Sequence, residues 1–367
     1  MNTSKKLRIA LNIALAATLI VACEKQNNLP APASTTQAKT TDDFIIGPTP
    51  IGFLSPWLVR KSIPGPLGVK GRYDAWSYSI GSRGYIGGGN VTNRAGSTSP
   101  ANDQYYFDST TLSWTQTASN PGNTLAGASS FVIDRKAYVC TGSSETAYVT
   151  NENWQYNSAS NVWTRKNPFP GGARIWAVGA ASGGKGYVGT GSSEHDGEGI
   201  QYGDWWQYDP KADSWARKAN YTTGGGRYHA VTFTSPAALG GKIYLGTGNY
   251  AVNANDAAFQ AYDPATDTWT ITPSMPANTG RAWAVGLSLL KGGFVLTGFN
   301  GVTGGDNDAY EFNFTTNKWT QIPNVQGGRI AAAGFALGND LYIAGGFNYV
   351  NATEVARDDM YVLHWTN

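Results

Sequence analysis

Most of the chain alternates short apolar runs with polar turns, in a pattern that repeats. Each unit begins with an apolar run, for which Ala284–Leu289 in the fifth unit is an example. The second run of a unit starts with an aromatic residue and ends with glycine, as Tyr244–Gly248 does in the fourth unit. A polar loop comes next, then an aromatic run such as Trp205–Tyr208, a tight polar turn and a run that contains a tryptophan. Runs of this length between Gly, Pro, Asn and Asp residues are typical of β-strands. Each unit is therefore predicted to contain four short strands.

The glycine-terminated run occurs six times. The intervals between the final glycines are 53, 49, 57, 50 and 48 residues. Bulky residues followed by glycine suit a strand that lies close to a neighbouring backbone. A repeat of about fifty residues predicts an array of equivalent units. The six copies are Tyr85–Gly89, Tyr138–Gly142, Tyr187–Gly191, Tyr244–Gly248, Phe294–Gly298 and Tyr342–Gly346.

A second motif places an Asp or Asn six positions before a tryptophan. Asp and Asn side chains bond nearby backbone amides and start tight turns, so the motif predicts a turn into the fourth strand. The large indole is expected to pack between neighbouring sheets. The five copies are Asp108 with Trp114, Asn157 with Trp163, Asp209 with Trp215, Asp263 with Trp269, and Asn313 with Trp319.

Together the two motifs resemble the kelch family over roughly residues 55–367. The resemblance implies an all-β, six-bladed kelch β-propeller with four antiparallel strands in each blade around a channel. The sequence departs from the usual kelch pattern at one point. Gly-Gly occurs in the first and sixth units, whereas the middle four carry Thr-Gly.

The two ends of the propeller are expected to meet in one blade. The sixth unit begins at Arg329, and its third strand is expected at 359–363, after which no fourth strand remains. Trp57 stands ahead of any first strand and is followed by Ile63-Pro64. We therefore predict that an N-terminal strand around Trp57 completes the sixth blade and pairs its open edge.

The N-terminus is predicted to direct export. Lys5, Lys6 and Arg8 precede an apolar run that ends at Ala22, as in a secretory signal peptide. The small residue before Cys23 resembles a bacterial lipobox, which implies that Cys23 is acylated and becomes the mature N-terminus. Alternatively, the protein is simply secreted and Cys23 has no role. The expected divisions are a signal peptide at 1–22, a flexible polar tether at 23–48 and the propeller at 49–367.

Charge and cysteine content narrow the expected partners. Removal of residues 1–22 takes away three of the 27 basic residues and none of the 25 acidic ones, which turns the formal net charge of +2 into −1. No basic tract indicates nucleic-acid binding. With Cys23 acylated, Cys140 has no partner within the chain, so stability is expected to come from the buried core.

The loops that lead into the first strands carry a candidate site at the mouth of the channel. Arginine forks match carboxylates, and aromatic rings stack on sugars or cations, which suggests an anion or glycan site. An acid also stands four residues before a third-strand apolar residue in five units, at Asp103, Glu152, Asp204, Asp308 and Asp359, whereas the fourth unit has Ala258. Pairing of arginines with acids between blades is therefore the structural alternative. The candidate ligand-binding residues are Arg72, Arg174, Trp176, Arg227, Tyr228, His229, Arg281, Trp283 and Arg329.

Metal and cofactor chemistry find little support in the sequence. The loop 193–198 holds Glu194, His195, Asp196 and Glu198, and 304–308 is calcium-like in composition, but neither has a known ligand spacing. Similarity to the kelch-type copper enzyme galactose oxidase would imply two tyrosines, two histidines and a tyrosine–cysteine cross-link. Besides Tyr228-His229, only His195 and His364 could supply the second histidine, so that set is incomplete. We predict no metal and no cofactor.

The predicted function is binding. The chain is expected to be lipid-anchored in the cell envelope and to recognise a glycan or an envelope protein through its loops. The enzymatic alternative is a sugar mutarotase or epimerase similar to the exported sialic-acid mutarotases. Such a reaction needs an acid, a base and a cation for the substrate carboxylate. His229 or Glu194, with Arg174, Arg227 and Arg281, would fill those roles.

Overall fold

The structure is a computed structural model. It describes residues 57–60, 62–65, 69–144, 148–194, 199–222, 225–250, 255–301, 304–350 and 353–366. The predicted signal peptide, the lipobox with Cys23, and the tether lie outside the described residues, as does the expected start of the propeller at residue 49. In the described part of the chain, no helix has the length and apolar character needed to cross a bilayer.

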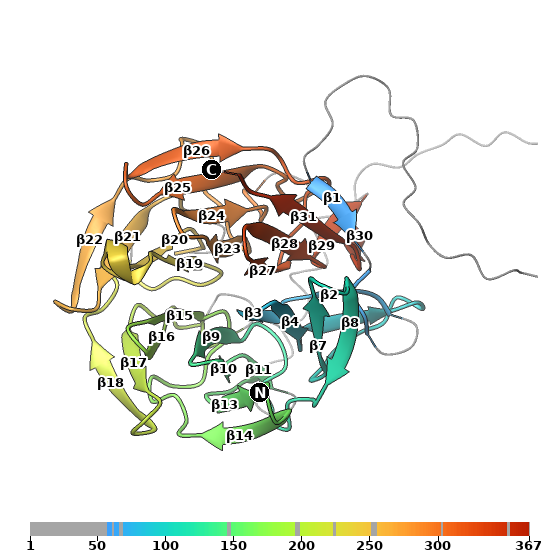
Figure 1. Cartoon of the computed structure of the whole chain (residues 1–367), viewed down its shortest axis with the longest axis horizontal. Helices are drawn as coiled ribbons and strands as arrows, with labels where there is room; N and C mark the ends of the chain where they lie inside the picture. Colours follow the sequence, from blue (N-terminus) through green and yellow to red (C-terminus); the bar gives the residue numbers. More distant parts are fainter. Residues whose placement is uncertain are drawn as a thin grey trace, which may run out of the picture. The chain divides into compact units, whose positions relative to one another are not determined.

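Within the described residues, six four-stranded antiparallel sheets surround a central channel (Figure 1). The predicted all-β propeller with four antiparallel strands in each blade is confirmed, and the six sheets agree with the predicted number of blades. Blade one contains β3 (Trp76–Ile80), β4 (Arg83–Gly87), β7 (Gln104–Asp108) and β8 (Ser113–Thr117), and blade two contains β9 (Ser129–Ile133), β10 (Lys136–Cys140), β13 (Asn153–Asn157) and β14 (Val162–Lys166). Blade three contains β15 (Val178–Ser182), β16 (Lys185–Gly189), β17 (Trp205–Asp209) and β18 (Ser214–Lys218), and blade four contains β19 (Val231–Thr234), β20 (Ile243–Gly246), β21 (Phe259–Asp263) and β22 (Thr268–Thr272). Blade five contains β23 (Val285–Ser288), β24 (Gly292–Leu296), β25 (Ala309–Asn313) and β26 (Lys318–Ile322), and blade six contains β27 (Ala333–Leu337), β28 (Asp340–Ala344), β31 (Met360–His364) and β1 (Trp57–Arg60).

The N-terminal strand completes the sixth blade, as predicted. Strand β1 pairs antiparallel with β31, with Trp57 opposite Leu363 and Leu58 opposite Val362. The Trp57 indole is buried and donates a hydrogen bond to the Pro323 carbonyl of blade five at 2.8 Å. The ring is therefore closed by strand pairing within blade six and by a contact to the neighbouring blade.

The glycine motif joins each blade to the next. In all six copies the amide of the final glycine donates a hydrogen bond to the carbonyl of the residue four positions before the first strand of the next blade. The pairs are Gly89 with Leu125, Gly142 with Arg174, Gly191 with Arg227, Gly248 with Arg281, Gly298 with Arg329, and Gly346 with Arg72, at 2.6 to 3.0 Å. The last pair crosses from blade six to blade one, so the hydrogen bonds form a complete ring.

The departure from Gly-Gly to Thr-Gly has a steric explanation in blade one. The residue before the final glycine has a positive φ in every blade, including Gly88 at 59° and Thr247 at 61°. A Cβ at Gly88 would lie 1.8 Å from the ring of Trp76, which opens the inner strand. In the middle blades the corresponding inner-strand residue is smaller, which leaves room for threonine. Those residues are Ser129, Val178, Val231 and Val285.

The Asp/Asn and tryptophan motif behaves as predicted. Each of the five Asp or Asn side chains accepts a hydrogen bond from the amide two residues later, at 2.9 to 3.0 Å. Four of the following indoles donate to a carbonyl of the preceding blade, as Trp57 does. These pairs are Trp163 with Ala118, Trp215 with Asn167, Trp269 with Ala219, and Trp319 with Pro273.

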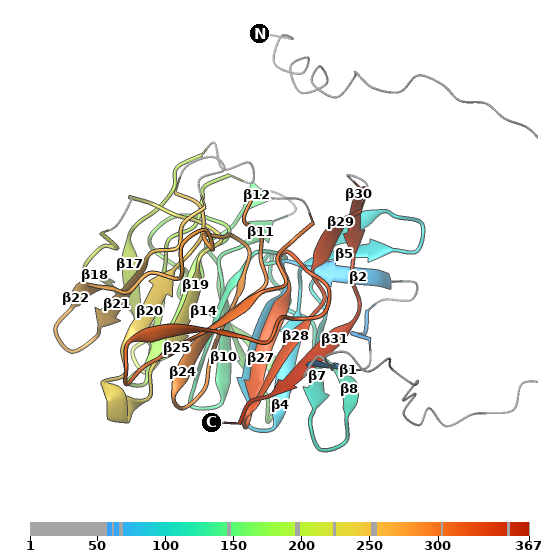
Figure 2. The same cartoon turned by 90° about the horizontal axis from the view of Figure 1, so that it is seen from above.

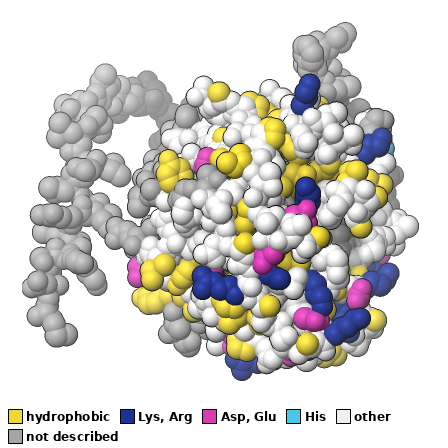
Figure 3. Space-filling model, turned by 90° about the vertical axis from the view of Figure 1, so that its left-hand side faces the viewer, with side chains coloured by type: hydrophobic (Ala, Val, Ile, Leu, Met, Phe, Trp, Pro, Cys, Tyr) yellow, Lys and Arg dark blue, Asp and Glu magenta, His cyan; other side chains and the backbone are white. Residues whose placement is uncertain are grey.

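Small additional sheets stand on one face of the ring, which we call the loop face. This face carries the loops that enter the first strands and the loops that join second to third strands (Figure 2). The side of the ring seen in Figure 3 shows basic and acidic side chains scattered among neutral ones. The additional strands are β2 (Val69–Tyr73), β5 (Asn90–Asn93), β6 (Thr98–Pro100), β11 (Ser143–Ser144), β12 (Tyr148–Val149), β29 (Phe347–Val350) and β30 (Thr353–Ala356), and the short helix η1 (Ala237–Leu239) lies between β19 and β20.

Candidate functional site

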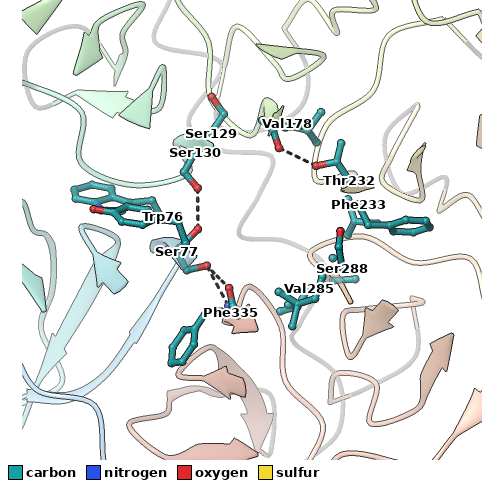
Figure 4. A pocket seen from close by; sticks show the side chains of 18 of the residues that line it. Trp76, Ser77, Ser129, Ser130, Val178, Thr232, Phe233, Val285, Ser288 and Phe335 are labelled. Atoms are coloured by element: carbon teal, nitrogen blue, oxygen red, sulfur yellow. Dashed lines mark hydrogen bonds between the residues drawn. The ribbon is translucent and has the colours of Figure 1, made fainter. Parts of the chain in front are cut away.

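The inner strands of all six blades line a chamber of about 430 Å³ (Figure 4). Its walls are built from small and hydroxyl-bearing residues. Several hydroxyls bond backbone carbonyls of the neighbouring blade: Ser77 to Gly334 at 2.8 Å, Ser130 to Ser77 at 2.8 Å and Thr232 to Gly179 at 2.9 Å. These hydroxyls hold neighbouring blades together around the channel.

A second cavity of about 150 Å³ lies at the mouth of the channel. Six alanines, one from each blade, line both cavities and form the boundary between them. Each alanine is preceded by a residue that lines only the smaller cavity, and we call this set the mouth ring. The mouth ring consists of Asp74, Gly127, Trp176, His229, Trp283 and Ala331, and the alanines are Ala75, Ala128, Ala177, Ala230, Ala284 and Ala332.

The mouth ring has the same backbone in every blade but different side chains. All six residues have φ between 53° and 60°, the left-handed region that costs a non-glycine residue roughly 1–2 kcal/mol. Neighbouring mouth-ring residues are joined by five backbone hydrogen bonds. In each, the amide of one residue donates to the carbonyl of the mouth-ring residue in the previous blade, at 2.8 to 3.2 Å. These bonds hold the unusual conformation in place. Because the backbone alone makes this ring, its side chains are available for another role.

Three aromatic side chains of the mouth ring pack together, with Trp283 stacked on His229 and Trp176 tilted against it. The His229 imidazole lies between the indoles of Trp176 and Trp283, with ring centroids 3.9 and 3.8 Å apart. Tyr228 is buried behind this stack, 5.8 Å from Trp176. Gly127 leaves the space for Trp176, because a Cβ there would lie 2.8 Å from the indole. The structure therefore brings together the four predicted aromatic and histidine site residues.

Asp74 is a member of the mouth ring that was not among the predicted site residues. Burial raises the pKa of its carboxyl to about 7; a hydrogen bond with Trp176 opposes the shift, and the charge of Glu354 on β30 adds to it. None of the described lysines or arginines contributes to this shift. The sequence held a usable signal, because Asp74 follows Arg72 by two positions just as Trp176 follows Arg174. The residues expected to face the mouth after the arginines were aromatic or histidine, and Asp74 is neither.

The five predicted arginines lie behind the mouth and do not face the cavity. Their side chains are 0 to 2% exposed, and each is paired with an acid. The nitrogen–oxygen distances are 2.7 Å for Arg72–Asp103, 2.5 Å for Arg174–Asp204, 2.9 Å for Arg227–Asp256, 2.7 Å for Arg281–Asp308 and 3.1 Å for Arg329–Asp359. Their geometry is therefore that of the structural alternative, in which the arginines pair with acids and do not bind a ligand.

Two details of that alternative need correction. The pairs form within blades, not between them, because the arginine precedes the first strand and the acid precedes the third strand of the same sheet. In blade four, Ala258 replaces the expected acid. Asp256, which stands two residues before Ala258, pairs with Arg227 instead. In blade two, which lacks the arginine, Glu152 accepts hydrogen bonds from the Asn123 amide and the Trp154 indole.

The metal and copper hypotheses gain no geometric support within the described residues. No three His, Cys, Asp or Glu side chains gather there as metal ligands would, and His195, Asp196 and Glu198 lie outside the described set. In the calcium-like turn, Asp308 is paired with Arg281, and Asp306 lies 3.9 Å from the same guanidinium. His364 bonds Asp340 at 2.6 Å at the ends of β31 and β28, away from the mouth ring. Cys140 is a buried free thiol whose pKa is raised by burial.

Comparisons with known proteins agree with this architecture. The chain is 25% identical over 146 residues to Kelch-like protein 25 of Xenopus tropicalis and 33% identical over 138 residues to Kelch-like protein terF of Aspergillus terreus. These matches cover 38% and 35% of this chain but only 22% and 30% of the relatives. A solved structure of YjhT superposes with a TM-score of 0.67 at 17% identity, covering 83% of this chain and 96% of the other. The fold is a kelch-repeat propeller. No protein-family model matches the chain.

Within this kelch propeller, the charge of Asp74 is expected to reduce stability as pH rises. A carboxyl with a folded-state pKa near 7 and an ordinary unfolded pKa binds more protons in the folded state between pH 4 and 7. The contribution of Asp74 to the free energy of unfolding is therefore greatest below about pH 4 and is lost as pH rises to 7. Asp74→Asn is expected to raise the free energy of unfolding by about 2 kcal/mol at pH 8 and by far less at pH 5. Urea unfolding at both pH values measures this difference.

Asp134→Asn is the matched control for that substitution. Asp134 also has a positive φ, of 49°, but it is exposed in the turn between β9 and β10. Its replacement is expected to change stability equally little at both pH values. An equal effect of the two substitutions would show that Asp74 is not destabilised by its surroundings.

Proposed function

We propose that the protein is an envelope-anchored binding protein whose loop face contacts a protein partner. The supporting observation is a set of exposed apolar side chains on the loops between second and third strands, which we call the apolar rim. Four blades contribute to it. The apolar rim consists of Tyr148, Ile200, Tyr250, Tyr349, Val350 and Val355, which are 43 to 80% exposed.

The distribution of exposed apolar residues supports a contact surface on this face. Half of the twelve large apolar residues exposed in the described chain belong to the apolar rim. The others are distributed over turns of the opposite face and the outer strands. Aromatic residues are enriched at protein interfaces, and exposed apolar side chains that gather on one face mark interaction sites. The kelch-repeat fold suits such a role, since its loops are carried by a rigid ring.

Anchoring by a lipid on Cys23 is part of the proposal. It is supported by the sequence of the N-terminus, and the polar tether at 23–48 would hold the propeller away from the bilayer. The rest of the chain would then face the periplasm or the outside. Labelling with a fatty-acid analogue, compared between the wild type and Cys23→Ala, tests the anchor separately from partner binding.

Partner binding is expected to depend on the apolar rim. Tyr148→Ser combined with Tyr349→Ser removes one exposed aromatic ring from each of blades two and six. We expect at least a tenfold loss of partner capture from envelope extracts, because aromatic side chains contribute much of the binding energy at interfaces. The melting temperature is expected to stay unchanged, since both residues are exposed.

The control removes exposed apolar residues from the opposite face. Leu112→Ser with Leu290→Ser alters turns between third and fourth strands and between first and second strands, at positions 42% and 76% exposed. Capture should survive these changes. Equal losses of capture in both variants would argue against a contact surface on the loop face. Binding of the protein to a glycan on a glycan array, without capture of a protein partner, would favour the glycan alternative.

One observation favours the enzymatic alternative, a sugar mutarotase or epimerase. Asp74, with a pKa of about 7, shares a small cavity with His229, and ring opening of a sugar needs an acid and a base. However, Arg174, Arg227 and Arg281 are paired with acids and would not hold a substrate carboxylate. Anomer exchange followed by NMR tests this alternative, and a rate equal to that of buffer removes it.

A further inference from the structure

The smaller cavity at the channel mouth has its own chemistry, separate from the apolar rim. We propose that it binds a positively charged ammonium group, carried either by a lysine side chain or by a small amine such as an amino sugar. The proposed ligand is therefore a cation, whereas the five arginines near the mouth suggest an anionic ligand when only the sequence is considered. The proposal concerns a different site from partner docking on the apolar rim, so either can fail alone.

The charges that line the cavity favour a cation. Asp74 and His229 are the titratable side chains among its described lining residues. The surrounding arginines do not offset the carboxylate, because each is buried and paired with an acid. Glu354 on β30 adds further negative charge near Asp74. An anionic ligand would therefore enter a cavity without an available cation.

The aromatic side chains of the mouth ring favour the same class of ligand. The indoles of Trp176 and Trp283 are only half-buried and line the cavity together with Asp74. Tryptophan faces attract ammonium groups with roughly 0.5–2 kcal/mol, most strongly where water is excluded. The Asp74 carboxylate can pair with an ammonium group, and the parts of the two indoles that line the cavity beside the intervening His229 ring supply aromatic contacts.

Among the described residues, no cationic side chain acts on the Asp74 carboxyl. Its pKa is raised mainly by burial; the hydrogen bond with Trp176 lowers it, and the negative charge of Glu354 raises it further. A buried charge is normally paired with an opposite charge. A bound ammonium group would provide that charge and would hold the carboxyl in its ionised form.

The size of the cavity restricts the ligand. A volume of about 150 Å³ is comparable to a cavity that accommodates benzene. It can hold the end of one side chain or one small amine, but not an oligosaccharide. The alanine boundary below the mouth ring continues into the larger chamber, which leaves space for a chain of methylene groups.

The test uses three ligands that differ in charge on one scaffold. These are Nα-acetyl-lysine amide, the same compound acetylated on Nε, and the same compound succinylated on Nε. Binding to the full chain is measured by tryptophan fluorescence and by calorimetry at pH 8. We expect the cationic compound to bind at least tenfold more tightly than the neutral one, and the anionic compound to bind most weakly. A second comparison, of glucosamine with glucose at pH 7, shows whether a small amine serves as well as a lysine side chain.

Asp74→Asn is expected to remove the preference for the cationic compound, whereas Asp134→Asn retains it. Asn tolerates a positive φ, so the substituted mouth ring keeps its backbone. For the wild type, binding of the lysine compound should weaken several-fold from pH 8 to pH 6, because its ammonium stays charged while Asp74, with a pKa of about 7, gains a proton. Equal binding of all three compounds, tighter binding of the anionic one, or an unchanged preference in Asp74→Asn would overturn the proposal.

Discussion

Replacing Arg281 by alanine is expected to lower the free energy of unfolding by about 3–5 kcal/mol, because it leaves the partly buried carboxylates of Asp306 and Asp308 without their counter-charge. The Arg281 side chain is fully buried and forms two hydrogen bonds with Asp308, at 2.7 and 2.8 Å. It also donates to the carbonyls of Thr279 and Thr297 at 2.9 and 3.0 Å. Its loss separates two loops of blade five. Urea unfolding at pH 7, monitored by circular dichroism, measures the change.

An exposed ion pair on the same protein provides the control. Arg83 is 42% exposed and lies 3.3 Å from Asp108 at the ends of β4 and β7. Surface pairs of this kind contribute about 0–1 kcal/mol, so Arg83→Ala should have a small effect. If Arg281→Ala cost no more than Arg83→Ala, the buried arginines would not be structural, and a ligand-binding role would regain weight.

The pH dependence of the Arg281 contribution also has a definite sign. Burial opposes ionisation of Asp308, yet Arg281 holds its pKa below the ordinary value. A carboxyl with a lowered folded-state pKa contributes stability above its unfolded pKa, and that contribution is lost as pH falls through the folded value. Asp74 has the opposite sign, since its pKa is raised. The two acids therefore have opposite effects on stability as pH rises, although both lie near the channel mouth.

The fold could be predicted because its information is local and repeated. Six glycine-terminated runs indicated six sheets, and the position of Trp57 indicated which end of the chain completes the last one. Each motif also has a local physical role in the structure. The Asp or Asn side chain bonds the amide two residues later, and the glycine amide bonds the next blade. Pattern and structure agree where one residue type is needed in every blade.

The site could be predicted only in part, because it is made where the blades differ. Trp176, His229 and Trp283 were expected near the mouth, and they form its stack of rings. Asp74 was missed because its position matters more than its residue type. The arginines were assigned to a surface, whereas repetition of a charged residue in five blades reflects a buried pairing required by each sheet. Asp256, the partner of Arg227 in blade four, was also missed, because it stands two residues before the position that the acid has in the other blades.

In the mouth ring, the backbone serves the fold in every blade, whereas the side chains differ and can serve function. Six residues with positive φ share one backbone geometry, which neighbouring blades hold by hydrogen bonds. Only Gly127 among them is the residue type that this backbone favours. The other five occupy it at a cost, and one of them carries a poorly solvated carboxyl. Departures from local preference of this kind concentrate at functional sites, which supports the mouth as a place of ligand contact.

Closure of the ring is the feature on which all these contacts depend, and Trp57→Ala is expected to weaken it most. The indole is 2% exposed, packs in the core between blades five and six and donates to Pro323. Truncating a buried tryptophan costs about 3–5 kcal/mol, and loss of β1 would also expose the edge of β31. Leu58→Ala is the control, because Leu58 pairs in the same strand but is 53% exposed. Urea unfolding should show the large loss only for Trp57→Ala, and hydrogen exchange should show faster exchange of β31 amides in that variant. If both variants behaved alike, β1 would hold the ring through its backbone alone and the Trp57 indole would not secure the sixth blade to the fifth.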